Sequence, residues 1–280
     1  MVLLWIAFVL SLLYLVLAGL YMLALMAKRK PKRGFHGKLG EFDYAHRGLY
    51  NPEAGVPENS LTAFRLAAQK GYGAELDVHL SRDGRLVVMH DTALKRTAGA
   101  NANIPAVTAQ VLGQLTLEGT KEKIPYLEQV VPLFENAGPL LIEIKTDNGN
   151  HAELTRKVCG LLKQYPDVTF CIESFDPRVL LWLKKHRPDV IRGQLSCNFI
   201  KERNGLSFAT AFLLKNLLMN FLTRPDFIAY RYEDRSCLAP ALCRKLWKPQ
   251  EFSWTVQDPE TAERLKKDGA LIIFEGFEAK

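Results

Sequence analysis

The chain has 280 residues, 48% hydrophobic and 24% charged, which suits one α/β barrel of about 250 residues and excludes a disordered chain, a collagen or a coiled coil. The net charge of +7 is concentrated, because five of the 37 basic residues fall within residues 28–33. The other 32 basic residues nearly balance the 30 acidic ones, which argues against a general nucleic-acid-binding protein.

The first predicted element is a transmembrane helix over residues 1–27. Residues 2–26 are apolar apart from Ser11 and two tyrosines, and at ~1.5 Å per residue they exceed a hydrocarbon core of roughly 30 Å. A secretory signal peptide is the alternative. Such a peptide places its basic residues before a core of about 7–15 residues, whereas here the charges follow a longer run.

The basic residues lie in a juxtamembrane linker, residues 28–40. Because Lys and Arg mark the cytoplasmic flank of a membrane helix, we expect a single-pass protein of the cell membrane with its N-terminus outside and the rest of the chain in the cytoplasm. The five cysteines fit that compartment. Their odd number and the lack of CxxC spacing predict free thiols and no zinc site.

Residues 41–280 are predicted to form one domain in which strands and helices alternate. Apolar runs predict strands at residues 41–45, 72–78, 85–89, 140–144, 168–173, 190–195, 227–230, 252–256 and 270–274. Helical patterns predict helices at residues 59–71, 151–164, 177–186, 206–222 and 259–268. The sequence Asp83-Gly84 favours a tight hairpin, which folds residues 85–89 back onto the second strand.

Without the hairpin strand, eight strands with crossover helices remain, which is the number and size of a (β/α)8 TIM barrel, an α/β fold. A doubly wound open sheet is the alternative. The barrel is favoured because the unusual polar residues come at the carboxyl ends of strands. These ends converge on one rim in a barrel but are spread along an edge in an open sheet.

Carboxylates on two of these strands predict a site for a hard divalent cation. Glu75 and Asp77 are two residues apart and therefore share one face of a strand, and Glu143 and Lys145 follow the same inward alternation on a later strand. Burying such carboxylates without a cation is costly, because like charges raise one pKa sharply. Oxygen ligands favour Ca²⁺ or Mg²⁺ over zinc. An ion cluster paired with Arg or Lys is the alternative.

Two histidines accompany the carboxylates: His46 follows the first strand and His90 follows the hairpin. Either one alone is more often structural than catalytic. Together, beside a metal-bound phosphodiester, they could take a proton from the nucleophile and give one to the leaving group. Arg47, next to His46, offers a fork of donors suited to a phosphate.

At this point the sequence resembles the glycerophosphodiester phosphodiesterase family, from Ala45 to about Gly269. The resemblance is carried, in order, by Ala45-His46-Arg47-Gly48, Pro57-Glu58-Asn59-Ser60, Gly73-Ala74-Glu75-Leu76-Asp77-Val78, Asp83-Gly84-Arg85-Leu86-Val87-Val88-Met89-His90-Asp91, Ile124-Pro125-Tyr126-Leu127-Glu128, Leu141-Ile142-Glu143-Ile144-Lys145, Ser174-Phe175-Asp176 and Trp254-Thr255-Val256.

The resemblance implies a (β/α)8 barrel with a divalent cation, Ca²⁺ or Mg²⁺, and acid–base catalysis. The metal ligands it implies are Glu75, Asp77 and Glu143, the catalytic residues are His46 and His90, and the substrate-binding residues are Arg47 and Lys145 at the phosphate, Glu58 at the rim and Trp254 in the pocket wall. One segment departs from the family pattern: the last strand lacks a Thr-Asp/Asn-x-Pro ending, and Glu275 is the only polar candidate there.

The expected function is metal-dependent hydrolysis of glycerophosphodiesters to glycerol phosphate and an alcohol. The expected partners are that small-molecule or lipid-headgroup substrate and the membrane, not nucleic acid. A lysophospholipase D acting on membrane lipid is one alternative. The apolar stretch at residues 207–223 would serve it as an interfacial helix, although an outer barrel helix has the same pattern. A catalytically inactive, membrane-anchored headgroup-binding protein is another, which the two histidines argue against.

Overall fold

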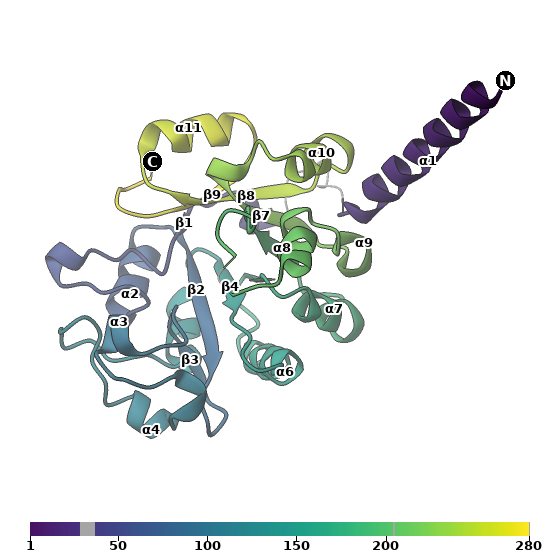
Figure 1. Cartoon of the computed structure of the whole chain (residues 1–280). Helices are drawn as coiled ribbons and strands as arrows, with labels where there is room; N and C mark the ends of the chain where they lie inside the picture. The colour runs from purple at the N-terminus through teal and green to yellow at the C-terminus, as the bar shows by residue number, and fades with distance from the viewer. Residues whose placement is uncertain (29–36, 204, 280) are drawn as a thin grey trace.

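Strands and helices alternate along the chain, as predicted, and the strands form one barrel (Figure 1). The computed structural model describes residues 1–28, 37–203 and 205–279. The barrel strands are β1 (Tyr44–Ala45), β2 (Gly73–Leu80), β4 (Leu140–Ile144), β5 (Phe170–Ser174), β6 (Arg192–Ser196), β7 (Phe227–Arg231), β8 (Gln250–Val256) and β9 (Leu271–Phe274). A further strand, β3 (Leu86–Val88), pairs antiparallel with the end of β2, which confirms the predicted hairpin.

Helices cover the outside of the barrel and fill the excursion between β3 and β4. The longer ones are α1 (Val2–Ala24), α2 (Leu61–Gln69), α6 (His151–Leu162), α7 (Pro177–His186), α8 (Phe208–Lys215), α10 (Leu238–Leu246) and α11 (Pro259–Lys267). The short α-helices are α3 (Lys95–Ala98), α4 (Ala109–Leu112), α5 (Leu127–Val130) and α9 (Asn220–Thr223). Single 3₁₀ turns are η1 (Gly37–Gly40), η2 (Pro52–Ala54), η3 (Ile104–Ala106), η4 (Val131–Phe134) and η5 (Tyr232–Asp234).

The barrel closes at its shortest strand. Tyr44 of β1 pairs with Gly73 of β2 on one side and with Ile273 of β9 on the other, and all eight barrel strands run parallel. The predicted (β/α)8 barrel is therefore confirmed, and the open-sheet alternative is excluded.

Large aromatic side chains form the floor of the barrel, below the ends of the strands. The rings of Tyr44 and Phe252 are 5.2 Å apart, and those of Phe227 and Phe252 are 4.7 Å apart. The Tyr44 hydroxyl donates to the carbonyl oxygen of Leu39 in η1, at 2.8 Å. The interior below the rim is therefore filled with side chains, which leaves polar chemistry to the carboxyl ends of the strands.

Several helical regions differ from the predictions: the short helices α3, α4 and α5 are not among the predicted ones, and two further differences lie between β6 and β8. The single helix predicted at residues 206–222 is two helices, α8 and α9, because Leu217 adopts a positive φ of 53° that ends the first helix before the second begins. Helix α10 was not predicted, although its buried Ala239 and Cys243 have helical spacing. The five cysteines are free, as expected, and four of them are buried.

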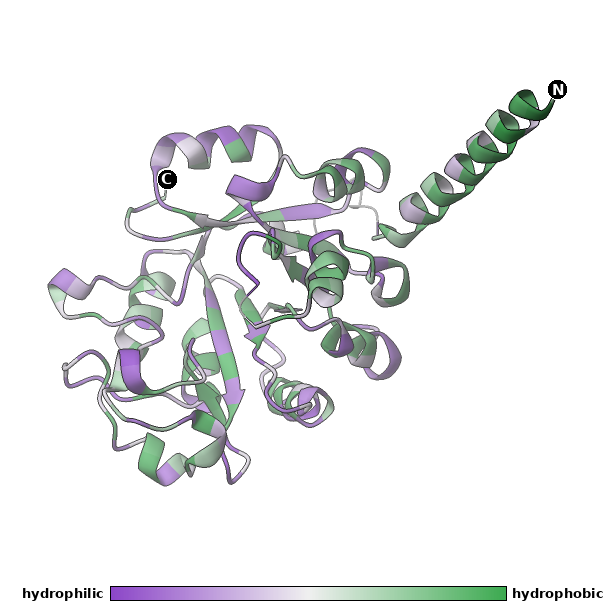
Figure 2. Ribbon diagram, in the orientation of Figure 1, coloured by the Kyte–Doolittle hydropathy of each residue, from purple (hydrophilic) through white to green (hydrophobic). Residues whose placement is uncertain are grey.

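Helix α1 projects away from the barrel, and most of its ribbon has the colour of hydrophobic residues (Figures 1 and 2). Its 23 residues contain an 18-residue stretch with a mean hydropathy of 2.6, enough to cross a membrane, although a signal sequence would have the same character. Within the basic flank, the structure describes Lys28, whereas Arg29, Lys30, Lys32 and Arg33 lie outside the described residues.

The closest packing inside the barrel gives a stability prediction. A methyl group on Gly193 of β6 would lie 1.9 Å from a ring carbon of Phe227, so Gly193→Ala should lower the free energy of unfolding by about 3 kcal/mol. Chemical unfolding of the full chain, followed by tryptophan fluorescence, measures this loss.

The matched control is Gly160→Ala on helix α6. No atom lies within 4 Å of the added methyl group there, so the substitution should stabilise the protein by about 0.5–1 kcal/mol through better helix propensity. Equal effects of the two substitutions would contradict the packing described here.

Candidate active site

Three buried carboxylates meet where β2 and β4 end. Glu75 and Asp77 project inward from β2, and Glu143 of β4 pairs in register with Asp77. Each of the three offers an oxygen within 4.8 Å of the other two, and all three side chains are buried. The structure thus brings the three predicted metal ligands together.

Electrostatics explains why these carboxylates suit a cation. Burial, reinforced by repulsion from Asp77 and Glu143, raises the pKa of Glu75 well above its usual range. Burial also raises the pKa of Glu143, in spite of the nearby Lys145 ammonium group. Carboxyl groups that are short of positive charge in this way provide the hard oxygen ligands that Ca²⁺ or Mg²⁺ prefers.

Lys145 and Arg47 compensate only part of this negative charge. Lys145 Nζ lies 2.8 Å from a Glu143 oxygen and 3.1 Å from an Asp77 oxygen, and Arg47 Nε lies 3.8 Å from the other Asp77 oxygen. Within the part of the chain that the structure describes, the polar contacts of Glu75 are the Arg47 backbone N–H, at 2.9 Å, and the His46 ring at 4.0 Å. An ion cluster paired with Lys and Arg would therefore explain the burial of Asp77 and Glu143, but it would not explain the burial of Glu75.

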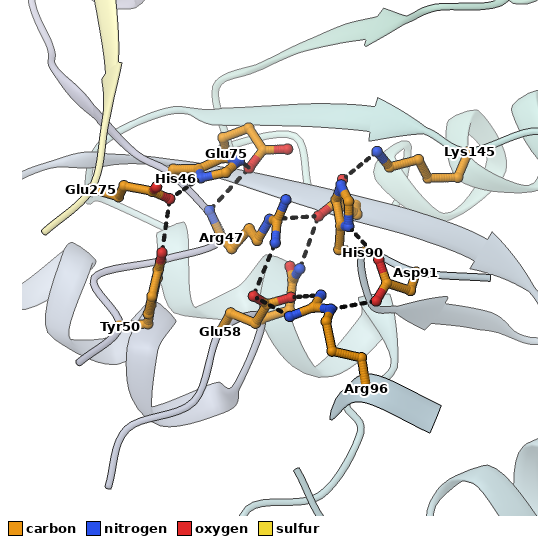
Figure 3. A network of polar contacts seen from close by, with 12 residues as sticks. His46, Arg47, Tyr50, Glu58, Glu75, His90, Asp91, Arg96, Lys145 and Glu275 are labelled. Carbon is orange, nitrogen blue, oxygen red and sulfur yellow. Dashed lines mark hydrogen bonds and ion pairs between the residues drawn. The ribbon is translucent and has the colours of Figure 1, made fainter. Parts of the chain in front are cut away.

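His46 is held by the segment that follows the last strand. Its Nδ1 lies 2.5 Å from a carboxylate oxygen of Glu275 (Figure 3). Tyr50 and Gln257 also donate to Glu275, each at 2.8 Å. Burial alone would raise the pKa of Glu275, but the contact with His46 and these two hydrogen bonds outweigh it and lower the pKa to about 2. An ionised carboxylate therefore faces the His46 ring.

His90 has its own carboxylate, and a chain of contacts leads from it to Arg47 (Figure 3). His90 Nδ1 lies 2.7 Å from Asp91, which accepts from Arg96 Nε at 2.5 Å. Arg96 also donates to both oxygens of Glu58, at 2.6 and 3.1 Å. Glu58 in turn accepts from the Arg47 guanidinium at 2.9 Å. This places Glu58 behind Arg47, in contact with the two arginines.

A hollow of about 90 Å³ opens between the histidines and the carboxylates. Its lining includes ten polar or aromatic residues: His46, Arg47, Glu75, His90, Glu143, Lys145, Glu173, Phe175, Trp254 and Thr255. Burial, more than the neighbouring charges, lowers the pKa of His90 to about 4, so this imidazole is neutral at pH 7. Every predicted site residue except Asp77 and Glu58 therefore lies in the wall of one hollow. The side chains of Asp77 and Glu58 make contact with residues that form this wall.

Four residues with contacts in the site receive no role in the sequence analysis: Glu173, Asp91, Arg96 and Asn59. Glu173 of β5 pairs in register with Glu143, is buried, and keeps one carboxyl oxygen without a hydrogen-bond partner among the described residues. The inward alternation that identified Glu143 continues to this strand and could have revealed it. Asp91 and Arg96 are five residues apart, and no periodic pattern marks such a pair. Asn59, the first residue of the predicted helix 59–71, lies before α2 and donates to Asp77 at 2.9 Å.

Comparison with known proteins gives a consistent result. The model of the glycerophosphoryl diester phosphodiesterase family matches residues 46–215. A glycerophosphodiester phosphodiesterase of Caldanaerobacter subterraneus subsp. tengcongensis is 30% identical over 235 residues, which are 80% of this chain and 89% of that protein. A human lysophospholipase D is 36% identical over 121 residues, which are 39% of this chain and 37% of that protein.

Solved structures also resemble the barrel. A phosphodiesterase of Oleispira antarctica, in complex with the product sn-glycerol-3-phosphate, is 25% identical with a TM-score of 0.67, covering 83% of this chain and 91% of that chain. A glycerophosphodiester phosphodiesterase of Thermotoga maritima is 28% identical with a TM-score of 0.62, covering 83% of this chain and 94% of that chain.

The carboxylate cluster predicts a metal-dependent stability. Ca²⁺ or Mg²⁺ should raise the thermal unfolding midpoint of the full chain, and EDTA should reverse the gain, because an ion that binds only the folded state stabilises it. Glu75→Gln should abolish the shift without lowering the midpoint in EDTA, since an amide replaces a carboxyl group whose pKa is already raised.

Glu153→Gln, an exposed carboxylate on α6, is the control and should keep the full shift. A thermal unfolding midpoint that does not change with EDTA would contradict the proposed ligand set. So would a midpoint that zinc restores after EDTA but Ca²⁺ and Mg²⁺ do not.

Proposed function

This chain belongs to the glycerophosphoryl diester phosphodiesterase family and is a phosphoric diester hydrolase, and from that premise we propose how it works and where. It hydrolyses glycerophosphodiesters to glycerol phosphate and an alcohol, with a divalent cation held by Glu75, Asp77 and Glu143. One observation carries the proposal: two histidines, each with its own carboxylate, face one hollow beside a buried carboxylate cluster.

The basic side chains bind the phosphate of the substrate. When bound, a divalent cation supplies charge stabilisation at the phosphate oxygens. Lys145 keeps its proton, because the attraction of Asp77 and Glu143 outweighs burial and raises its pKa. Arg47 presents a fixed fork of N–H donors, whose orientation Glu58 holds. The substrate phosphate thus takes the place of carboxylates that the Lys145 and Arg47 side chains contact in the structure.

The two histidines divide the proton transfers between them. His90 is neutral at pH 7 and acts as the general base on the attacking hydroxyl. His46 acts as the general acid, and the ionised Glu275 at Nδ1 holds its ring in place with Nε2 on the side of Glu75. The attacking group is either water or the substrate's own glycerol hydroxyl, and only the second route passes through a cyclic phosphate product.

Two aromatic residues in the wall of the hollow receive the alcohol part of the substrate. The rings of Phe175 and Trp254 are 5.8 Å apart in an edge-to-face arrangement. Trp254 Nε1 is buried without a hydrogen-bond partner among the described residues, so a polar headgroup atom can accept its proton. Trp254 and Phe175 are accordingly proposed as the headgroup contacts.

Either His46→Ala or His90→Ala should lower kcat/KM by about 10²–10⁴-fold, because each removes one proton transfer from the transition state. The wild-type profile of kcat/KM against pH should be bell-shaped. It falls on the acid side as His90, the base, becomes protonated, and on the alkaline side as the general acid loses its proton. Steady-state assays of the full chain with glycerophosphocholine, glycerophosphoethanolamine, glycerophosphoglycerol and lysophospholipids measure these effects.

Both variants should retain the metal-dependent rise in unfolding midpoint, which separates lost chemistry from lost folding. Wild-type turnover by either variant would remove that histidine from the mechanism. Cleavage of lysophospholipids alone would favour the lysophospholipase D alternative, and trapping a cyclic phosphate would identify the glycerol hydroxyl as the nucleophile.

We also propose that α1 anchors the protein. It spans the cell membrane and leaves the barrel in the cytoplasm. Its length, its uncharged surface and the basic flank from Lys28 onward support this orientation. The substrates would then be diesters inside the cell or at the inner leaflet.

Reporter fusions at the C-terminus test the orientation. An alkaline phosphatase fusion after Lys280 should be inactive and a cytoplasmic reporter at the same position active, because the first folds only outside the cytoplasm. The reverse pattern, or release of a soluble protein shortened at its N-terminus, would place the barrel outside.

A further inference from the structure

The C-terminal end of α1 is fixed to the barrel by direct contacts. Leu25 is completely buried, and its carbonyl oxygen accepts from Asn220 Nδ2 at 3.4 Å and from Cys243 Sγ at 3.5 Å. Trp247 Nε1 donates to the Met22 carbonyl at 3.1 Å. These contacts attach α1 to α9 and α10 directly, without an intervening linker at this end.

The contact continues one turn earlier and one turn later. The Tyr21 hydroxyl donates to Asn216 at 3.2 Å, and Lys28 Nζ lies 2.7 Å from Asp226 just before β7. The Lys28 backbone N–H also donates to the Pro225 carbonyl at 2.8 Å. The orientation of the barrel relative to α1 is therefore determined by packing.

The length of α1 sets the depth of this contact. At ~1.5 Å per residue, its 23 residues span about 34 Å, against a hydrocarbon core of roughly 30 Å. The last turn, which contains Tyr21 and Met22, must therefore lie at the edge of the membrane core. Any barrel element that contacts this turn lies at the level of the lipid headgroups.

The elements at this level have exposed apolar side chains. We define the apolar patch as Phe208, Phe212, Leu213, Phe221 and Leu222, on α8 and α9, each between 39% and 61% exposed. Helices α8 and α9 lie on the side of the barrel from which α1 departs, and α8 is largely apolar on its surface (Figures 1 and 2). An exposed cluster of this kind marks an interaction surface.

Charge identifies lipid as the occupant of the patch. Residues 206–225 contain no acidic side chain, and their two basic side chains are Lys215 and Arg224. An apolar surface with basic residues beside it suits the boundary between acyl chains and anionic headgroups. We propose that the apolar patch inserts into the headgroup region of the membrane that α1 spans, an inference that rests on the proposed anchor.

This orientation brings the catalytic hollow close to lipid. Ala211, on the inner side of α8, packs with Phe199, and the Phe199 ring lies 5.6 Å from Phe175 in the hollow wall. One helix therefore separates the alcohol side of the hollow from the membrane surface. Diesters whose alcohol is still associated with lipid would reach the site along this face.

The test attaches the fluorophore NBD to single introduced cysteines of the full chain in vesicles containing phosphatidylglycerol. Phe212→Cys and Phe221→Cys probe the patch, and Leu12→Cys probes the middle of α1. Val111→Cys on α4 is the matched control, because Val111 is 48% exposed but lies at the far end of the molecule from α1 (Figure 1). The wild-type chain gives the background from native thiols, which is low because four are buried.

We expect blue-shifted emission and quenching by shallow spin-labelled lipids at positions 212 and 221, deep quenching at position 12, and neither effect at position 111. Lipid contact at position 12 with water-like signals at 212 and 221 would overturn the inference and leave the anchor intact. Water-like signals at position 12 as well would overturn both. Unchanged unfolding midpoints of the labelled variants establish that each signal comes from a folded chain.

Discussion

Burying three carboxylates within 4.8 Å of one another is the constraint on which the rest of the active site depends. Their mutual repulsion must be offset, so Lys145, Arg47 and Asn59 are placed around Asp77 and Glu143, while Glu75 has no ion pair with a Lys or Arg side chain among the described residues. The geometry of the barrel makes this arrangement possible. Parallel pairing of β2 with β4 fixes the register of the carboxylates, which stay together in spite of their repulsion.

The two histidines resemble each other in having a carboxylate at Nδ1, but their surroundings differ. Glu275 is ionised and accepts from Tyr50 and Gln257 in addition to its contact with His46. Asp91, beside His90, also accepts a hydrogen bond from Arg96, and Arg96 in turn donates to Glu58. Because Glu58 also holds Arg47, the proposed phosphate contact and the proposed base belong to one network (Figure 3).

Most of the fold could be predicted because strand alternation is a strong local signal. Glu75, Asp77 and Glu143 face inward for that reason, and the ends of parallel strands meet at one rim. The break between α8 and α9 depends on the backbone of Leu217, for which the sequence has no glycine or proline signal. The pairing of His46 with Glu275 spans 229 positions, and only closure of the barrel brings the two together.

That closure has a consequence for synthesis of the protein. The first barrel strand pairs with the last, so a ribosome must complete β9 before β1 has both neighbours. Contacts this distant in sequence form slowly. By that time α1, which precedes the barrel in the chain, has already left the ribosome, while the seam of the nascent barrel is still open. Because Glu275 follows β9 directly, His46 gains its carboxylate only when the seam closes, and an incomplete chain holds no assembled active site.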